Sequence, residues 1–176
     1  MAAVLVDKQI ADTEVCARCI VHPLMYSESK NCLKDQAFQP KWDERDASVL
    51  RLNYCTKEFC LRHGENLKMN GQTFVGLAFI TSGQVEEVNQ WAASENSKKK
   101  YDGENIDINR TVAHVVYAPM HNGKYVDTKE DVYTEGNVDM PMHADLRYTE
   151  KLDDDVKTRV REFARQLMKK AQFEHK

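Results

Sequence analysis

The sequence lacks long hydrophobic runs and the glycine patterns that mark nucleotide-binding or nucleophilic sites. No apolar stretch approaches the roughly 18 residues that span a bilayer. The N-terminal segment MAAVLVDKQIADTEV is too acidic, and its apolar stretch too short, for a secretory signal. The seven glycines form no G-x-G-x-x-G pattern and no phosphate-binding loop, and no serine stands in a G-x-S-x-G setting. These absences argue against a helical membrane protein. They also mean that the sequence contains none of the common catalytic motifs named above.

The composition indicates one folded domain, 1–176, without internal repeats. Hydrophobic residues make up 41% and charged residues 30% of the chain, which is typical of a folded protein rather than a disordered one. The net charge of −3 gives no general attraction to nucleic acid or to anionic membranes. Five cysteines is an odd number, and nothing in the sequence indicates export. We therefore expect reduced thiols and a cytoplasmic location.

Hydrophobic periodicity predicts an α+β fold. Residues 153–173 are the clearest helix, because apolar side chains recur there every three or four positions, with acids at the start and bases along the end. Shorter helices are predicted at 57–63, capped by Thr56 and stopped by Gly64, and at 84–93. Strands are predicted at 15–21, 48–54, 73–81, 110–118 and 143–149. We expect a mostly antiparallel sheet of four to six strands covered by two or three helices, with polar loops near 90–109 and 119–142.

Two cysteine–histidine segments, CARCIVH at 16–22 and CTKEFCLRH at 55–63, have the spacing of two halves of a metal site. On a strand, however, Cys16 and Cys19 point to opposite faces of the sheet. Cys60 and His63 share a helix face and are the remaining candidates for zinc or another divalent metal. Packing of the cysteines in the core is the leading alternative, and redox chemistry is a third. No cofactor is predicted.

The segment HADLRYT places His143, Asp145 and Arg147 on one face of a predicted strand. His114 lies in another predicted strand, within TVAHVVYA. If these two strands are neighbours, His114, His143 and Asp145 could form the catalytic cluster of a metal-dependent hydrolase acting on nucleic acid or a nucleotide. The alternative is a half-exposed, salt-bridged sheet face, with His114 as a hydrogen-bonded core histidine.

Charge is unevenly distributed, with an acidic stretch at 102–155 followed by a basic helix. Lys157, Arg161, Arg165 and Lys169 recur every four residues and form a stripe that could contact phosphates or a partner protein. The alternative is a solvated helix face, paired with the acidic stretch of the same chain or of another copy.

The segments DQAFQP, SVLRLNY, GLAFITSGQV and PMHADLRYT resemble small bacterial proteins of unknown function, some of them encoded beside larger enzymes. This resemblance implies neither an activity nor any site residue. The sequence therefore favours a non-catalytic cytosolic interaction protein, with a place as an accessory subunit of a larger bacterial complex, whose partner is another protein chain, self or non-self. The hydrolase is the first alternative, and a nucleic-acid-binding module that uses the basic helix is the second. No membrane contact is expected.

Overall fold

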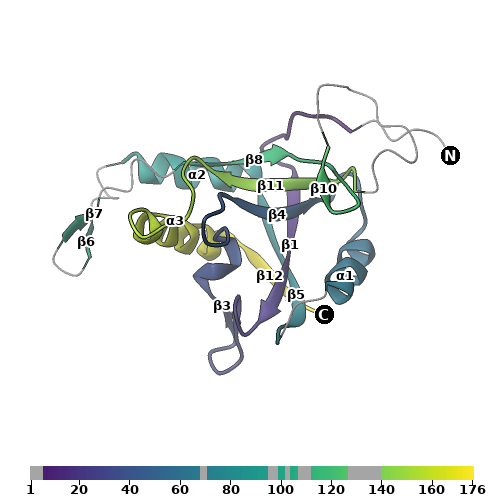
Figure 1. Cartoon of the computed structure of the whole chain (residues 1–176), viewed down its shortest axis with the longest axis horizontal. Coiled ribbons are helices and arrows are strands. Elements are labelled where there is room, and N and C mark those ends of the chain that lie inside the picture. Colours follow the sequence, from purple (N-terminus) through teal and green to yellow (C-terminus); the bar gives the residue numbers. More distant parts are fainter. Residues whose placement is uncertain (1–5, 68–70, 95–98, 102–103, 107–111, 127–139) are drawn as a thin grey trace.

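The computed structural model describes residues 6–67, 71–94, 99–101, 104–106, 112–126 and 140–176. Its centre is a six-stranded antiparallel sheet in the order β12-β5-β1-β4-β11-β8 (Figure 1). The strands of this sheet are β1 (Val15–His22), β4 (Asp46–Arg51), β5 (Thr73–Thr81), β8 (Ala113–Tyr117), β11 (His143–Tyr148) and β12 (Gln172–His175). The predicted α+β class and antiparallel sheet are confirmed.

Three α-helices and one short 3-10 helix accompany the sheet. They are α1 (Lys57–Asn66), α2 (Ser82–Ala92), α3 (Lys157–Lys170) and the 3-10 helix η1 (Asp35–Phe38). Three two-stranded hairpins complete the described chain: β2 (Tyr26–Ser27) with β3 (Cys32–Leu33), β6 (Lys99–Tyr101) with β7 (Glu104–Ile106), and β9 (Met120–His121) with β10 (Lys124–Tyr125). No helix in these described ranges is long and apolar enough to cross a membrane.

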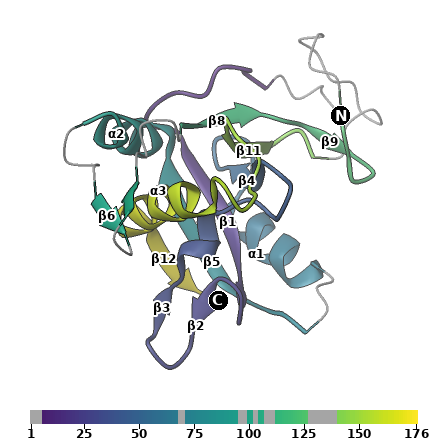
Figure 2. The same ribbon diagram turned by 60° about the vertical axis from the view of Figure 1, so that its left-hand side comes forward.

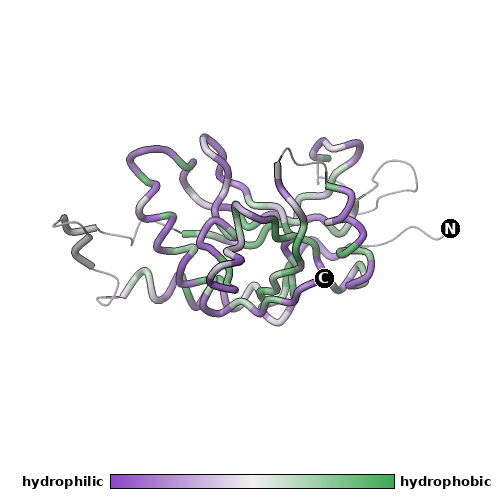
Figure 3. The backbone as a smooth tube through the Cα atoms, turned by 90° about the horizontal axis from the view of Figure 1, so that it is seen from below, coloured by the Kyte–Doolittle hydropathy of each residue, from purple (hydrophilic) through white to green (hydrophobic). Residues whose placement is uncertain are grey.

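Helices cover both faces of the sheet, as Figures 1 and 2 show, with α2 and α3 on one side and α1 on the other. Along β11, Ala144, Leu146 and Tyr148 point to the side of α3 and join the larger core. The smaller core lies under α1, where Cys60 packs with Leu50. Because successive strand residues face opposite sides, β1 contributes to both cores. Figure 3 shows hydrophobic segments gathered in the middle of the molecule.

The helix starts follow the capping residues in the sequence. The Thr56 hydroxyl accepts a hydrogen bond from the backbone N–H of Phe59, and Thr81 forms a reciprocal capping box with Gln84. The predicted stop at Gly64 is wrong, because α1 continues to Asn66. Gly64 is buried inside the helix, where a Cβ atom would collide with the ring of Phe74. This glycine therefore allows α1 to approach the sheet closely.

The C-terminal segment differs most from its prediction. The Asp153 carboxylate accepts hydrogen bonds from the backbone N–H groups of Asp155 and Val156, and regular α3 begins only at Lys157. The predicted helical end at 173 is wrong, since α3 ends at Lys170 and the chain continues as β12 beside β5. The ring of Phe173 packs against Tyr26 with centroids 5.2 Å apart. Tertiary packing thus overrides the helical spacing of apolar residues in this segment, which forms a strand instead of a helix.

The two predicted polar loops are partly visible. Within 90–109 the described residues include the end of α2 and the hairpin β6–β7, and within 119–142 they include the hairpin β9–β10. Asn122 and Gly123 both have positive φ angles, as the predicted turn at HNG requires. Residues 95–98, 102–103, 107–109 and 127–139 of these loops lie outside the described residues.

Candidate functional site

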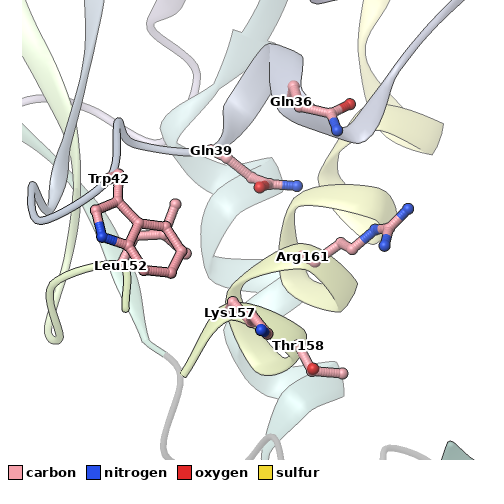
Figure 4. Close-up of a pocket in the computed structure, with 7 residues that line it drawn as sticks. All are labelled: Gln36, Gln39, Trp42, Leu152, Lys157, Thr158 and Arg161. Carbon is pink, nitrogen blue, oxygen red and sulfur yellow. The ribbon is translucent and has the colours of Figure 1, made fainter. Parts of the chain in front are cut away.

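A hollow of about 260 Å³ lies between the end of η1, the segment that follows it and the first turns of α3 (Figure 4). Its walls come from parts of the chain more than one hundred residues apart. The lining residues are Gln36, Gln39, Trp42, Leu152, Lys157, Thr158 and Arg161. The hollow therefore combines an indole ring, two amides and two cations.

Trp42 is presented to solvent by a fixed backbone. Its indole is 58% exposed, although tryptophan is normally among the more buried residue types. The backbone N–H of Asp43 donates to the carbonyl of Leu152 at 2.8 Å, and the N–H of Leu152 donates to Glu44 at 2.8 Å. Trp42 and Leu152 form a parallel bridge, with the Leu152 side chain buried. The exposed ring thus rests on an ordered support.

The two amides beside Trp42 have unsatisfied polar atoms. Within the described residues, the buried Gln36 Oε1 and the buried Gln39 Nε2 have no hydrogen-bond partner. A buried polar atom without a partner costs about 1–3 kcal/mol, so such atoms call for an explanation. One is an acceptor and the other is a donor.

The predicted basic stripe forms the α3 side of this region. Lys157 and Arg161 line the hollow, and both are exposed. Every member of the stripe already has a partner on this chain. Lys157 pairs with Asp154 (2.6 Å), Arg161 and Arg165 with Asp35 (2.7 and 3.5 Å), Arg165 also with Glu162 (2.9 Å), and Lys169 with the Gln166 amide (3.2 Å). Among the described residues, the Lys157–Asp154 pair joins the stripe to the acidic stretch at 102–155, as the sequence predicted for that pairing.

The structure brings together two of the three predicted catalytic residues. His143 and Asp145 are 4% and 0% exposed, and His143 Nε2 lies 4.0 Å from Asp145 Oδ1. His143 Nδ1 lies 2.6 Å from the carbonyl oxygen of Ala118, which requires this nitrogen to be the donor. In the neutral ring, Nε2 therefore carries the lone pair that faces Asp145. Burial lowers the pKa of His143 and favours this neutral form.

Asp145 is a buried carboxyl group with weak compensation. Neither of its oxygens receives a hydrogen bond of normal geometry from the described residues, and Arg147 Nη2 lies 3.5 Å from Oδ2. Arg147 is shared with Asp46, to which its Nε donates at 2.7 Å. Burial, followed by repulsion from Asp46, raises the pKa of Asp145 to about 6, while Tyr125 and Arg147 act in the opposite direction.

The third predicted catalytic residue lies on the neighbouring strand, as the prediction requires. His114 is exposed on β8 and stands opposite Arg147, two cross-strand pairs along the ladder from Asp145. The alternative reading of His114 as a core histidine is therefore wrong. The His143–Asp145 pair offers two ligand atoms, fewer than the three or four protein ligands of a zinc site. Over the described ranges, no three His, Cys, Asp or Glu side chains converge in a way that could hold a metal.

The two cysteines of the first predicted metal segment point to opposite faces of the sheet. Cys16 belongs to the core under α2 and α3, whereas Cys19 packs on the α1 side, which confirms their opposite directions. Cys60 is buried with its sulfur 3.6 Å from that of Cys55, and the His63 ring stacks on Phe59 with centroids 6.3 Å apart. The Cys60 sulfur thus lies within hydrogen-bonding distance of another thiol.

The hollow beside Trp42 was not predicted from the sequence. The stripe on α3 was visible from its spacing, but Gln36, Gln39 and Trp42 lie between the predicted strands 15–21 and 48–54, where no regular element was predicted. A tryptophan within such a segment was the one available signal, since a large aromatic ring on a loop needs either a packing or a binding role.

Similarity to known proteins assigns no role to these residues. No family model, curated protein or solved structure matches the chain. The interpretation of the hollow, of the His143–Asp145 pair and of the thiols therefore rests on their geometry and chemistry.

Proposed function

We propose that this protein acts without catalysis, by binding an extended acidic segment of another protein in the hollow beside Trp42. The observation that carries this proposal is the 58% exposed indole of Trp42, fixed next to two amides that lack partners. An exposed aromatic ring on an ordered support is a common anchor of protein interfaces. The large apolar side chains exposed in the described chain are Leu24, Trp42 and Tyr125, and of these Trp42 lines the hollow.

The two amides support an extended peptide as the occupant. Both atoms are buried, so each amide side chain must first turn toward the occupant; Gln36 Oε1 can then accept a hydrogen bond from a backbone N–H, and Gln39 Nε2 can donate to a backbone carbonyl. Both groups would then gain the partners that they lack within the described chain. Main-chain hydrogen bonds of this kind bind peptides of varied sequence, while pockets for side chains supply the selectivity.

The charges favour an acidic peptide. Lys157 and Arg161 form one wall of the hollow, and Arg165 continues the same helix face. Arg161 is held by Asp35 at 2.7 Å, which fixes the position of its guanidinium group. A fixed guanidinium group binds carboxylates well because little side-chain entropy is lost. We infer an occupant with Asp or Glu beside an apolar residue.

The same surface is less suited to nucleic acid. Two cations of the stripe, Lys157 and Arg161, line the hollow, and the net charge of the chain is −3. Binding to a phosphate backbone depends mainly on several cations that neutralise successive phosphates. A nucleic-acid-binding module therefore ranks behind the acidic protein segment.

We place this role in an accessory subunit of a larger bacterial complex, in the cytoplasm. The five cysteines are all free, which fits a reducing compartment. A surface with one exposed aromatic ring and a few oriented polar groups suits a protein whose role is to bind a larger partner. The partner is another protein chain, with a second copy of this chain as the alternative that sizing would reveal.

The proposal is tested by panning a displayed library of random peptides on the wild-type protein. Enriched peptides are expected to contain Asp or Glu next to an apolar residue. Trp42→Ala should weaken their binding by about tenfold or more, because an anchor aromatic typically carries a large share of the binding energy. Lys157→Glu should weaken it through charge repulsion. Dissociation constants measured by fluorescence anisotropy give both comparisons.

Leu24→Ala is the matched control, because Leu24 is an exposed apolar side chain that does not line the hollow. It should leave the affinity unchanged. Enriched peptides that bind Trp42→Ala as tightly as wild type, or a library that yields none, would contradict the proposal. Strong binding of a single-stranded oligonucleotide that falls steeply with salt would replace the acidic peptide by nucleic acid.

The hydrolase that uses His114, His143 and Asp145 stays a prediction. The buried His143–Asp145 pair supports it in part, since a neutral imidazole nitrogen faces a carboxyl group whose pKa is raised. His114 is exposed on β8, and this position does not add support for the hydrolase. The metal suggested for Cys60 and His63 likewise stays a prediction, as does zinc or another divalent ion at either place.

A further inference from the structure

Cys55 and Cys60 lie side by side at the start of α1. Cys55 directly precedes the helix cap Thr56, and Cys60 lies in the helix four residues beyond that cap. Their sulfur atoms are 3.6 Å apart. A disulfide bond has an S–S length of about 2.05 Å, so closing it requires an approach of roughly 1.5 Å. Rotation of the Cys55 side chain in the turn before the helix can supply such a movement.

The two thiols have different environments. Cys55 is half-buried, while Cys60 is fully buried on the sheet-facing side of α1. The Cys55 thiol donates to the carbonyl oxygen of Arg51 at 3.3 Å, and between the two sulfur atoms either can be the donor. Their hydrogen bond lowers the pKa of Cys55, although burial opposes this, whereas the same hydrogen bond and burial raise the pKa of Cys60. Cys55 is thus the more exposed sulfur and the one that ionises more readily.

We infer that Cys55 and Cys60 form a reversible dithiol–disulfide pair, in which Cys55 attacks a small disulfide and Cys60 resolves the product. The inference rests on the separation of the two sulfur atoms and on their unequal exposure. The oxidised form joins the turn after β4 covalently to the first part of α1. This role is independent of the hollow beside Trp42.

The chemistry balances with oxidised glutathione as the oxidant. The Cys55 thiolate attacks one glutathione sulfur, forms a mixed disulfide and expels one glutathione thiolate. Cys60 then gives up its proton and attacks the Cys55 sulfur, which breaks the mixed disulfide and expels the second glutathione thiolate. Both thiolates take up protons. Two protein thiols are oxidised and one glutathione disulfide is reduced.

The other cysteines lack this arrangement. Burial raises the pKa of Cys16 to about 12 and that of Cys19 to about 11, so both resist conversion to thiolate. Cys19 contacts the carbonyl oxygen of Cys60 at 3.8 Å rather than its sulfur. Cys32 is exposed on the hairpin β2–β3 and provides an internal reference for simple accessibility.

The test is oxidation of the folded full chain with oxidised glutathione, followed by acid quenching, alkylation and digestion with trypsin. Trypsin cleaves after Arg51, Lys57 and Arg62, so Cys55 and Cys60 fall on separate peptides. The expected product is these two peptides, 52–57 and 58–62, joined by a disulfide with a mass roughly 2 Da below their sum. Dithiothreitol should release them.

Two variants assign the steps. Cys60→Ala should leave glutathione attached to Cys55, because the resolving thiol is gone, and Cys55→Ala should leave Cys60 unmodified. Cys32→Ser is the control and should not change the yield of the linked peptides. Absence of the 52–57/58–62 link in the wild-type protein overturns the inference without any variant having to fold. A link through Cys19, or modification of Cys60 before Cys55, overturns the assignment as well.

Discussion

At the scale of single residues, Asp145 places a carboxyl group inside the sheet with little compensating charge. It is 0% exposed, and its nearest cation, Arg147, is also bound to Asp46. A carboxylate buried with so little compensation costs free energy when it ionises. The protein therefore carries a destabilising charge at neutral pH.

Asp145→Asn is expected to stabilise the protein at pH 8. The pKa of Asp145 is raised in the folded state to about 6, so its contribution to stability is full below about pH 4 and is lost as the pH rises to about 6. Asparagine does not ionise, so the variant loses no stability from this side chain over this pH range, and Arg147 keeps its partner Asp46. The variant should gain roughly 1–3 kcal/mol at pH 8 and nearly nothing at pH 4, measured by urea unfolding at both values.

His143 requires a separate control because its effect has the opposite sign. Burial lowers the pKa of His143, so its contribution to stability is lost as the pH falls below the ordinary histidine range. The difference between wild type and Asp145→Asn at each pH isolates the carboxyl group. Asp43→Asn, at a side chain that is 80% exposed, should change stability by less than about 0.5 kcal/mol at both pH values. An equal gain at pH 4 and pH 8 would contradict the assignment.

The sequence predicted the pairing of His143 and Asp145 but not their burial. Two residues at i and i+2 on a strand share a face whatever the rest of the chain does. Whether that face is covered depends on α1, on the hairpin β9–β10 and on the position of the strand in the sheet. Strand β8 lies at the sheet edge and β11 lies inside it, which leaves His114 exposed and buries Asp145.

At the scale of elements, the pairing of β5 with β12 depends on Gly76. This glycine has a φ angle of +155° and lies next to a bulge in the pairing of β1 with β5. A Cβ atom at Gly76 would fall on the backbone carbonyl of Glu174 in β12. Both the angle and the close approach of the two backbones require glycine here.

Gly76→Ala is expected to destabilise the protein by about 1–3 kcal/mol, because backbone atoms cannot move aside as a flexible side chain can. Hydrogen exchange should show faster exchange of the β12 amides, since the added methyl group pushes that strand away. Gly71→Ala is the control, with φ of +68° but open space around the new methyl group. A cost no greater than that of Gly71→Ala, with unchanged β12 protection, would disprove the close-packing argument.

At the scale of the whole molecule, one buried arginine joins the N-terminal segment to the sheet. Arg51 is fully buried, and its Nε and Nη2 donate to the two carboxylate oxygens of Glu14 at 2.5 and 2.9 Å. It also donates to the backbone carbonyl groups of Asp7 and Gln9. The segment that precedes β1 is therefore fixed to the end of β4 by one guanidinium group.

Glu14→Gln is expected to cost about 3–5 kcal/mol, since it keeps the shape but leaves the buried charge of Arg51 uncompensated. The segment 6–13 should loosen, and trypsin should cleave after Lys8 at a protease concentration that leaves the wild type intact. Glu28→Gln is the control, because Glu28 is 70% exposed and only 3.8 Å from His22. A loss of less than about 1 kcal/mol would mean that Arg51 has other sufficient partners.

Periodicity and capping predicted most of the fold, because they depend on local sequence. The start of α1 followed Thr56, and the buried face of α3 followed its apolar spacing. Helix α2 begins at Ser82, two residues before its predicted start, because Thr81 caps it. Strand β12, the extension of α1 past Gly64 and the hollow beside Trp42 escaped prediction. Each of these depends on which distant segments come into contact, and a single sequence carries no direct signal of that.

The position of β11 between β4 and β8 also determines when the sheet can close during folding. Asp46 and Arg147 meet across this pairing although they are 101 positions apart in the chain. Pairings over such separations are slow to form, because a long loop must close before any hydrogen bond is gained. Until 143–148 insert, the inner edges of β4 and β8 both remain open to pairing with other chains. Refolding yield should therefore fall as protein concentration rises, with this insertion as the step that competes with aggregation.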